Sequence, residues 1–179
     1  MKTRTKKCFN CKEEFTPFNS LQKFCLKNEC IKEMIQVQKN KEWNKKKKKL
    51  VEELKTVNDY LKIAQQIFNK YIRQRDNGLN CISCNKPCKK ENAGHYYSQG
   101  GHSNVRFDED NVHLQCEACN TYLSGNLLNY QIGIKERIGS QRLMELQGKA
   151  HETKKWNKDE LKELIEFYKN KLKKYSFIK

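Results

Sequence analysis

The sequence predicts a mainly α-helical protein with small β-hairpins, in which zinc stabilises modules too small to fold by burial alone. Two sets of four cysteines indicate the metal-bound modules, and apolar residues at helical spacing follow each set. Hydrophobic residues make up 36% of the 179 residues and charged residues 32%, which is a thin supply for one large core. The sequence has no run of roughly 18 apolar residues and no apolar signal-peptide region, so we expect an intracellular protein without a membrane span.

The first cysteine set lies in residues 1–33 and consists of Cys8, Cys11, Cys25 and Cys30. Two close cysteine pairs about a dozen residues apart can converge on one tetrahedral ion, so we interpret this segment as an N-terminal zinc ribbon. The residues between the pairs supply a small apolar floor of Phe15, Phe18 and Phe24. Modules of this size usually need the metal to fold. The alternative is a set of thiols without a metal.

Residues 34–77 are expected to form one long basic helix. Apolar residues recur at alternating spacings of four and three, at Leu50, Leu54, Val57, Leu61, Ala64, Phe68 and Tyr71. This spacing is typical of a coiled-coil seam, which could pair with a second copy of the chain or pack on other helices of the same chain. The turn dipeptide Asn77-Gly78 is expected to end the helix.

The second cysteine set lies in residues 78–139 and consists of Cys81, Cys84, Cys116 and Cys119. Because 31 residues separate its two pairs, segment 93–115 is interpreted as a loop or hairpin inserted between two zinc knuckles. If all four thiolates of a set bind the ion, no coordination position stays open, so both zinc sites are expected to be structural. Cys88 is unpaired and is expected to be a spectator, with exchange into the ligand set as a minor alternative.

Residues 140–179 are expected to form C-terminal helices. A helix that begins after the second cysteine set should end at Gly139, and Ser140 can cap a short helix that stops at Gly148. Asn157 and Glu160 have the spacing of a capping box. An apolar stripe follows, made of Leu161, Leu164, Ile165, Tyr168, Leu172 and Tyr175.

The net charge of +16 indicates a polyanionic partner such as DNA, RNA or an anionic membrane surface. The charge is uneven, because residues 1–80 carry 20 basic and only 9 acidic side chains. Five consecutive lysines, Lys45, Lys46, Lys47, Lys48 and Lys49, are predicted to contact a phosphate backbone. Lysine binds phosphate as a point charge and reads no sequence. The alternative is a solvated helix face on a lysine-rich surface.

The insertion between the zinc knuckles carries candidate catalytic residues. Hydrolysis of a phosphodiester needs a base to activate water and a cation to stabilise the developing charge. His95 is the candidate base, and Asn120 and the carboxylates of Asp108, Glu109 and Asp110 offer oxygens that suit Mg²⁺. His95 could then face Asn120 across a shallow groove, while Asn111 fixes a loop through its side-chain amide. The plainer alternatives are a surface histidine, a solvated acidic turn and a helix-capping asparagine.

The segments "GHY", "RFDEDNVHLQCEACN" and "SGN" together resemble the HNH or ββα-metal nuclease motif. Asn111 lies five residues before Cys116, as that motif requires, and Cys116-x-x-Cys119-Asn120 resembles the form in phage recombination endonuclease VII. More specifically, "AQQIFNKYIRQRD", "CISC", "AGHY", "LSGN" and the C-terminal "KWNKDELKELIEFYKNKL" resemble the NinG (Rap) recombination proteins of lambdoid phages. This resemblance spans nearly the whole chain.

The resemblance implies a structure-selective endonuclease with an HNH-like core that cuts branched recombination intermediates such as D-loops and Holliday junctions. It implies that His95 is the general base, that Asn111 holds the loop of the base, and that Asn120 ligates Mg²⁺ or Mn²⁺. His95 itself and Asp108 are further candidate ligands, and Arg106 is a further candidate for contact with DNA. A homodimer would cut opposing strands, and the site of action would be the cytoplasm of a bacterium that carries the phage or prophage.

Two positions depart from the nuclease pattern. Gly94 and Leu123 stand where metal-ligating side chains are usual. The missing ligand could be replaced by His95, by a carboxylate of residues 108–110, or by water. The departures also keep a second interpretation open, in which the chain is a non-catalytic zinc-containing DNA-binding protein in recombination or transcription.

Overall fold

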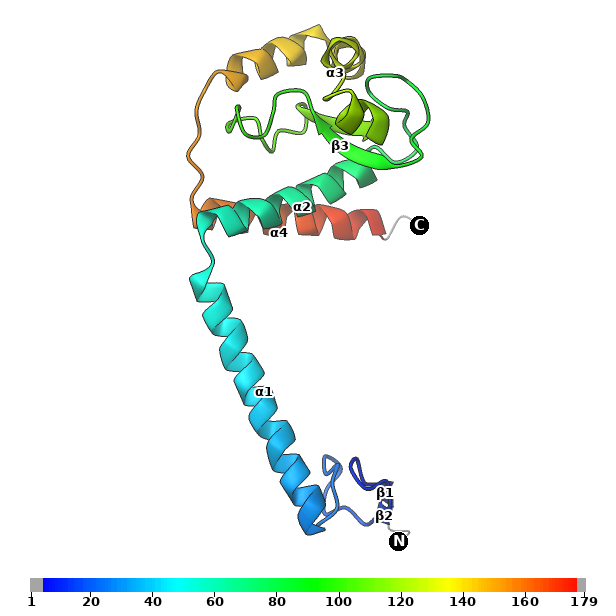
Figure 1. Cartoon of the computed structure of the whole chain (residues 1–179), viewed down its shortest axis with the longest axis vertical. Helices are drawn as coiled ribbons and strands as arrows, with labels where there is room; N and C mark the ends of the chain where they lie inside the picture. The colour runs from blue at the N-terminus through cyan, green and yellow to red at the C-terminus, as the bar shows by residue number, and fades with distance from the viewer. Residues whose placement is uncertain (1–4, 177–179) are drawn as a thin grey trace. The chain divides into compact units, whose positions relative to one another are not determined.

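The structure is a computed structural model that describes residues 5–176 (Figure 1). Its elements are mainly α-helices, with two small antiparallel β-hairpins, which confirms the predicted fold class at this level. The chain divides into two compact units, Met1–Lys55 and Thr56–Lys179. No described helix combines the length and the low charge that crossing a bilayer requires.

The first unit is built around the first cysteine set. Strand β1 (Lys6–Lys7) pairs with β2 (Glu14–Phe15), and helix α1 (Asn28–Leu54) follows. Phe24 is buried among the four cysteines, and Phe15 and Val37 pack against this cluster. Phe18 is 82% exposed, so the predicted apolar floor has two of its three phenylalanines.

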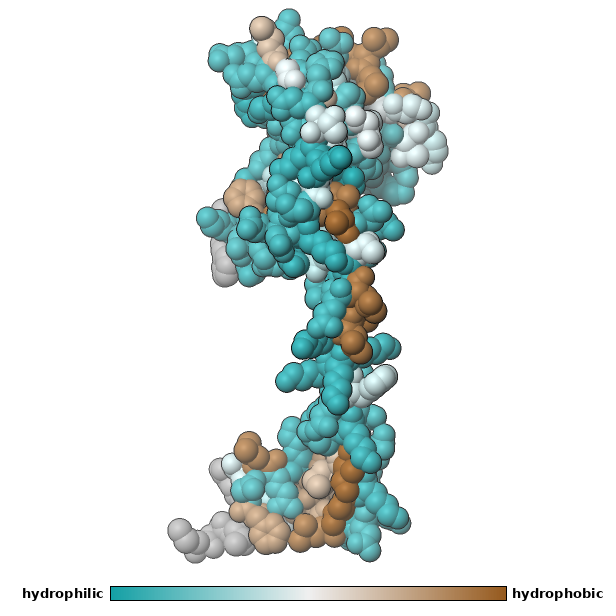
Figure 2. Space-filling view, turned by 90° about the vertical axis from the view of Figure 1, so that its left-hand side faces the viewer, coloured by the Kyte–Doolittle hydropathy of each residue, from teal (hydrophilic) through white to brown (hydrophobic). Residues whose placement is uncertain are grey.

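Helix α1 is largely exposed along its length. Of its residues only Cys30, which belongs to the cysteine cluster, is buried. Figure 2 shows apolar side chains exposed among hydrophilic ones on this helix, and they belong to Met34, Ile35, Trp43, Leu50, Val51 and Leu54.

The prediction of one helix through residues 34–77 is wrong, because the helix breaks at Lys55. Helix α1 ends at Leu54 and helix α2 spans Val57–Arg75. Thr56 caps α2: its Oγ1 accepts a hydrogen bond from the Asp59 amide at 3.3 Å, and its own amide donates to the Asp59 carboxylate at 2.8 Å. This reciprocal capping box starts a new helix where the apolar spacing alone runs on without interruption.

The second unit has its main core between α2 and α4 (Lys158–Ser176), which lie side by side in Figure 1. The buried residues of this core include Phe68, Ile72, Leu161, Ile165 and Tyr168. The predicted seam therefore packs within the chain from residue 57 onward, whereas its first two members, Leu50 and Leu54, are exposed. The predicted capping box of α4 is confirmed, because the Glu160 amide donates to Asn157 Oδ1 at 2.9 Å and the Asn157 amide to Glu160 Oε2 at 3.1 Å.

A β-hairpin and two further helical segments complete the second unit. Strand β3 (Glu91–His95) pairs antiparallel with β4 (Val112–Cys116). A one-turn π-helix, η1 (Ala118–Tyr122), and helix α3 (Leu127–Ala150) follow. As expected, Gly139 interrupts α3, with φ 81° and ψ 164°, but the second part runs through Gly148 to Ala150.

The Tyr130 hydroxyl of α3 enters the hairpin. It donates to the Gly94 carbonyl at 2.8 Å and accepts from the His113 amide at 3.1 Å, and these two residues are partners in the strand register. Tyr130 is fully buried, and burial raises the pKa of its hydroxyl, which therefore stays protonated and able to donate. A side chain thus bridges two backbone groups next to His95.

Candidate functional site

The structure brings each predicted cysteine set together. In both sets the four Sγ atoms lie within 4.8 Å of one another, and none of the nine cysteines forms a disulfide. The Sγ atoms of Cys11 and Cys25 are 3.7 Å apart, and those of Cys84 and Cys116 are 3.8 Å apart. Sulfurs bound at about 2.3 Å to a tetrahedral zinc ion lie about 3.8 Å apart, so both clusters could hold structural zinc.

One thiol in each cluster favours the thiolate form that a metal needs, whereas burial raises the pKa of Cys30, Cys84 and Cys119. Burial alone would raise the pKa of Cys8, but backbone amides, the Cys25 amide first among them, lower it to about 6. The same balance lowers the pKa of Cys81 to about 7, with the Cys116 amide as the main donor. Cys88 lies outside both clusters, and burial together with the neighbouring thiolates raises its pKa to about 11.

The structure brings His95 and Asn120 to one cavity of about 370 Å³ in the second unit. His95 ends β3, and Asn120 lies in η1, directly after the last cysteine of the second cluster. The cavity is lined by Asn69, Arg73, Asn92, Ala93, His95, Ser98, Gln99, Asn120, Ser124 and Gly125. His95 and Asn120 therefore lie on the same cavity, as predicted. The second cysteine cluster lies next to Asn120, since Cys116 ends β4 and Cys119 directly precedes Asn120.

His95 is set up as a neutral imidazole with a defined proton position. Its Nε2 lies 3.2 Å from the Arg106 carbonyl oxygen, which can only accept, and 3.4 Å from Gln65 Nε2, which can only donate. The shorter contact favours the proton on Nε2 and a lone pair on Nδ1. Burial and, to a smaller extent, the charge of Arg106 lower the pKa of His95 to about 4, against the raising effect of hydrogen bonds to the Arg106 and Ala93 backbone. The ring is therefore uncharged near neutral pH and able to accept a proton.

Asn111 fastens the loop that supplies this carbonyl group. It is fully buried, and its Oδ1 accepts from the Tyr97 amide at 2.7 Å. Its Nδ2 donates to the carbonyl oxygens of Tyr97 and Val105, each at 3.0 Å. These bonds join the two ends of loop 96–111, as the sequence suggested, and so fix the position of the residue next to Arg106.

The acidic run does not reach the cavity. Asp108 accepts from the Asp110 amide at 2.9 Å, and its carboxylate lies 3.7 Å from Lys149. Glu109 is bound by Tyr71 at 2.7 Å and pairs with Lys171, and Asp110 pairs with Arg142. Among the described residues, no third cluster of histidine, cysteine and carboxylate ligands accompanies the two cysteine sets. Asp108 is therefore engaged elsewhere rather than beside His95 and Asn120.

The space beside Gly94 is filled by Gln115. A Cβ atom added at Gly94 would lie 2.1 Å from Gln115 Oε1 and 2.9 Å from Gln115 Cβ. Gln115 Nε2 donates to Ser83 Oγ at 2.8 Å and to the Gly125 carbonyl at 2.6 Å, whereas Oε1 has no hydrogen-bond partner in the described part of the chain. Gln115 does not itself line the cavity. An unpartnered amide oxygen therefore stands where a side chain at position 94 would begin.

Helix α2 also contributes residues to the cavity, which the cysteine and nuclease motifs did not predict. Asn69 and Arg73 line it, and they follow Gln65 at intervals of four residues. Positions four apart share one face of a helix, so these three polar residues form a stripe beside the apolar one. This polar stripe is the feature of the sequence from which Asn69 and Arg73 could have been predicted as site residues.

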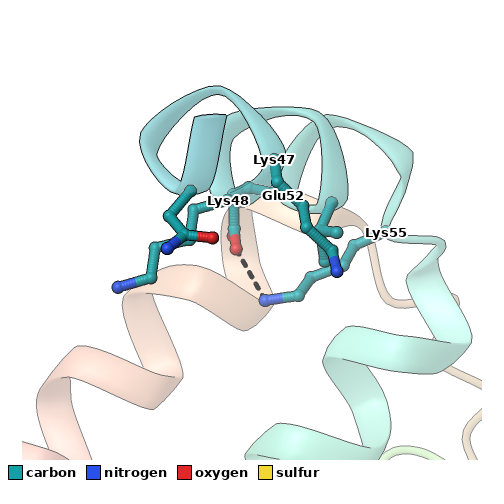
Figure 3. Close-up of a pocket in the computed structure, with 6 residues that line it drawn as sticks. Lys47, Lys48, Glu52 and Lys55 are labelled. Atoms are coloured by element: carbon teal, nitrogen blue, oxygen red, sulfur yellow. Dashed lines mark hydrogen bonds and ion pairs between the residues drawn. The ribbon is translucent and has the colours of Figure 1, made fainter. Parts of the chain in front are cut away.

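The predicted phosphate-contacting lysines, Lys45–Lys49, are all exposed on α1. Figure 3 shows Lys47, Lys48 and Lys55 around the last turns of this helix, where Lys55 pairs with Glu52 at 2.6 Å. Arg106 lies in the second unit, where its Nε donates to Gln65 Oε1 at 2.9 Å. The lysines are therefore accessible to a polyanion, whereas Arg106 is held by the protein.

Comparison with known proteins identifies the family of the chain. A family profile described as "Bacteriophage Lambda NinG protein" matches residues 1–176. The chain is 40% identical to Protein ninG of Salmonella phage P22 and 38% identical to that of Escherichia phage lambda, in each case over 121 residues. These matches cover 67% of the chain and 59% of each relative, so the chain spans less than two thirds of the length of these two proteins.

A further relative, Protein ninG of Enterobacteria phage H19B, is 34% identical over 193 aligned positions, which cover 96% of the chain and 94% of the relative. No solved structure matches the chain. The profile match covers almost every residue from the first cysteine set to the end of α4. The chain therefore belongs to the NinG family.

Proposed function

We propose that this chain is a metal-dependent, structure-selective DNA endonuclease with an HNH-like core, which hydrolyses phosphodiesters in branched recombination intermediates such as D-loops and Holliday junctions. The observation that carries the proposal is the cavity that His95 and Asn120 share beside the second cysteine cluster. The hairpin β3–β4 and the helical turn η1 support it, because they present these two residues in the order of the nuclease motif.

His95 is the proposed general base. With its proton on Nε2 held by the Arg106 carbonyl, the Nδ1 lone pair is free to take a proton from water. The low pKa of His95, about 4, keeps the ring in the accepting form at neutral pH. Asn111 contributes by positioning, since its hydrogen bonds hold the loop on which the Arg106 carbonyl lies.

A divalent cation would supply stabilisation of the charge that develops on the phosphate. Asn120 offers a carbonyl oxygen for it, and Asn92, Ser98 and Ser124 are neutral oxygen donors on the same cavity. No carboxylate is among the described residues that line this cavity. Mg²⁺ is usually held by carboxylates together with substrate phosphates. The donor set therefore fits a cation that binds together with DNA better than a resident one.

Selectivity for branched DNA would come from backbone geometry. The lysines of α1 are exposed and can contact phosphates without reading bases. A homodimer would let two cavities cut opposing strands, and the exposed apolar residues of α1 are the candidate contact between copies. Equilibrium sedimentation at the assay concentration measures this, and a monomer there would contradict the dimer.

The test is cleavage of a labelled four-way junction by the full chain with Mg²⁺ or Mn²⁺. We expect wild type to cut and His95→Ala to lose about 10²–10⁴-fold in rate, the usual contribution of a general base. His151→Ala is the matched control, because His151 is exposed and is not among the residues that line the cavity. The proposal fails if neither metal supports cleavage, or if His95→Ala cuts as fast as His151→Ala.

A second candidate function is non-catalytic binding of DNA by a zinc-containing protein. The observation that favours it is the lack of a carboxylate among the described residues of the cavity. This alternative expects tight, salt-sensitive binding of the junction without any metal-dependent product. Competition between branched DNA and structured RNA would show which nucleic acid is preferred.

A further inference from the structure

One wall of the His95 cavity is built by α2. Asn69 and Arg73 line the cavity, and Gln65 lies one turn before Asn69 on the same face. Gln65 Nε2 donates to Asn69 Oδ1 at 2.8 Å, and Gln65 Oε1 accepts from Arg106 Nε at 2.9 Å. The first two residues of the stripe are therefore fixed by hydrogen bonds within the protein.

Arg73, the third residue of the stripe, is the cationic side chain among the described residues that line this cavity. Within residues 5–176 its guanidinium has neither a hydrogen-bond partner nor an ion pair, whereas the other arginines of the unit are held by protein groups: Arg75 by Asp76, Arg106 by Gln65, Arg137 by Asn80 and Arg142 by Asp110. Among the described residues, no carboxylate lines the cavity to neutralise it. The structure thus presents an unpaired planar cation beside a neutral base.

We propose that Arg73 binds a backbone phosphate of the nucleic acid and holds it beside His95. The guanidinium presents several N–H donors in one plane, which match two phosphate oxygens at once. This inference rests on the proposed function, because it takes the cavity to be the place where the phosphodiester lies.

The experiment measures the Kd of the full chain for a labelled four-way junction, with Ca²⁺ in place of Mg²⁺ so that binding is observed without turnover. We expect Arg73→Gln to raise the Kd about tenfold and to reduce the slope of log Kd against log salt by about one, the effect of one lost phosphate contact. Lys70→Gln is the matched control, since it removes one charge from an exposed position of α2 outside the cavity. For this control we expect a change in Kd of less than about twofold.

Arg73→Lys should keep the salt slope but lose part of the affinity, because lysine retains the charge without the planar pair of donors. Both variants of Arg73 should melt like wild type, since the Arg73 guanidinium has no polar partner in the described part of the chain. The inference is overturned if Arg73→Gln binds the junction like Lys70→Gln. If wild type fails to cleave with Mg²⁺ or Mn²⁺ while Arg73→Gln still binds more weakly than Lys70→Gln, the nuclease proposal fails and the phosphate contact stands.

Discussion

His113, the strand partner of Gly94, is a buried histidine whose two ring nitrogens both contact protein groups. It is only 2% exposed. Arg75 Nη2, which can only donate, lies 3.1 Å from its Nδ1, so the ring proton is on Nε2, 3.1 Å from the Asp110 carbonyl. Burial lowers the pKa of His113 to about 4, and the charges of Arg75 and Arg137 add to this against the opposing charge of Asp76.

This arrangement predicts a pH dependence of stability. The folded-state pKa of His113 lies below the value of about 6.5 expected for an unfolded chain, so the unfolded state binds the proton first as the pH falls. The stabilisation present above about pH 6.5 should therefore decrease toward pH 4. His113→Asn, which keeps an acceptor for Arg75, should show a flatter decrease than wild type in urea unfolding at pH 7.5, 6 and 5. Parallel curves for the two proteins would contradict the assignment.

Local spacing predicted some site residues and could not predict others. Each cysteine pair is a short motif, and Asn120 follows its cysteine directly, so these positions depend little on the rest of the fold. Asn69 and Arg73 reach the cavity only because α2 packs against the hairpin, and 15 residues separate α2 from β3 in the sequence. The prediction that Asp108 lies at the metal site fails for the same reason, because its carboxylate lies near Lys149 of α3, which is distant in the sequence.

At the scale of elements, the break between α1 and α2 is the clearest difference from the sequence prediction. Apolar spacing reports which face of a helix is buried, but it carries no information about where one helix ends and the next begins. The Thr56-x-x-Asp59 pair did carry that information, as a capping box. The analogous Asn157-x-x-Glu160 pair is predictable from the sequence as a helix start, because no apolar periodicity continues through it from the preceding segment.

The capping box of α2 predicts a loss of stability when it is removed. Thr56→Ala should lower the free energy of unfolding of the second unit by about 1 kcal/mol, because the Asp59 amide loses its acceptor. Thr153→Ala, at an exposed position before α4, is the control and should change it by less than about 0.5 kcal/mol. Urea midpoints followed by circular dichroism measure both. Equal midpoints for the two variants would show that the cap contributes nothing.

At the scale of the whole molecule, the two units depend on their cysteine clusters to different degrees. The buried core of the first unit consists of Phe24 and three of the four cysteines themselves. The second unit adds an apolar core between α2 and α4 and another around Tyr130 and Ile134. Composition predicted small metal-held modules and mainly helical structure, but it could not show that one module has an apolar core of its own, because that depends on α4 packing against a distant helix.

Removal of metal should therefore affect the units unequally. Purified protein should carry two zinc ions, one for each cluster, and Cys25→Ser and Cys119→Ser should each retain one. Chelation should expose the segment before α1 to protease while α2 and α4 stay protected. Cys88→Ser is the control and should keep both ions, since Cys88 lies outside the clusters. Metal analysis and limited proteolysis measure these outcomes, and equal protease sensitivity of both units would contradict them.

The Tyr130 hydroxyl is hydrogen-bonded to both Gly94 and His113, which face each other in the hairpin. It therefore fixes the register of the two strands whatever the length of the loop that joins them. In most hairpins the turn sets which residues face each other, so an insertion in the turn shifts the register. Here a phenol from α3 and the amide of Asn111 close the loop at its base. The exposed tip of this loop, residues 100–101, can therefore gain length at small entropic cost without moving His95. This tip is thus a part of the protein in which sequences can diverge while the cavity keeps its shape.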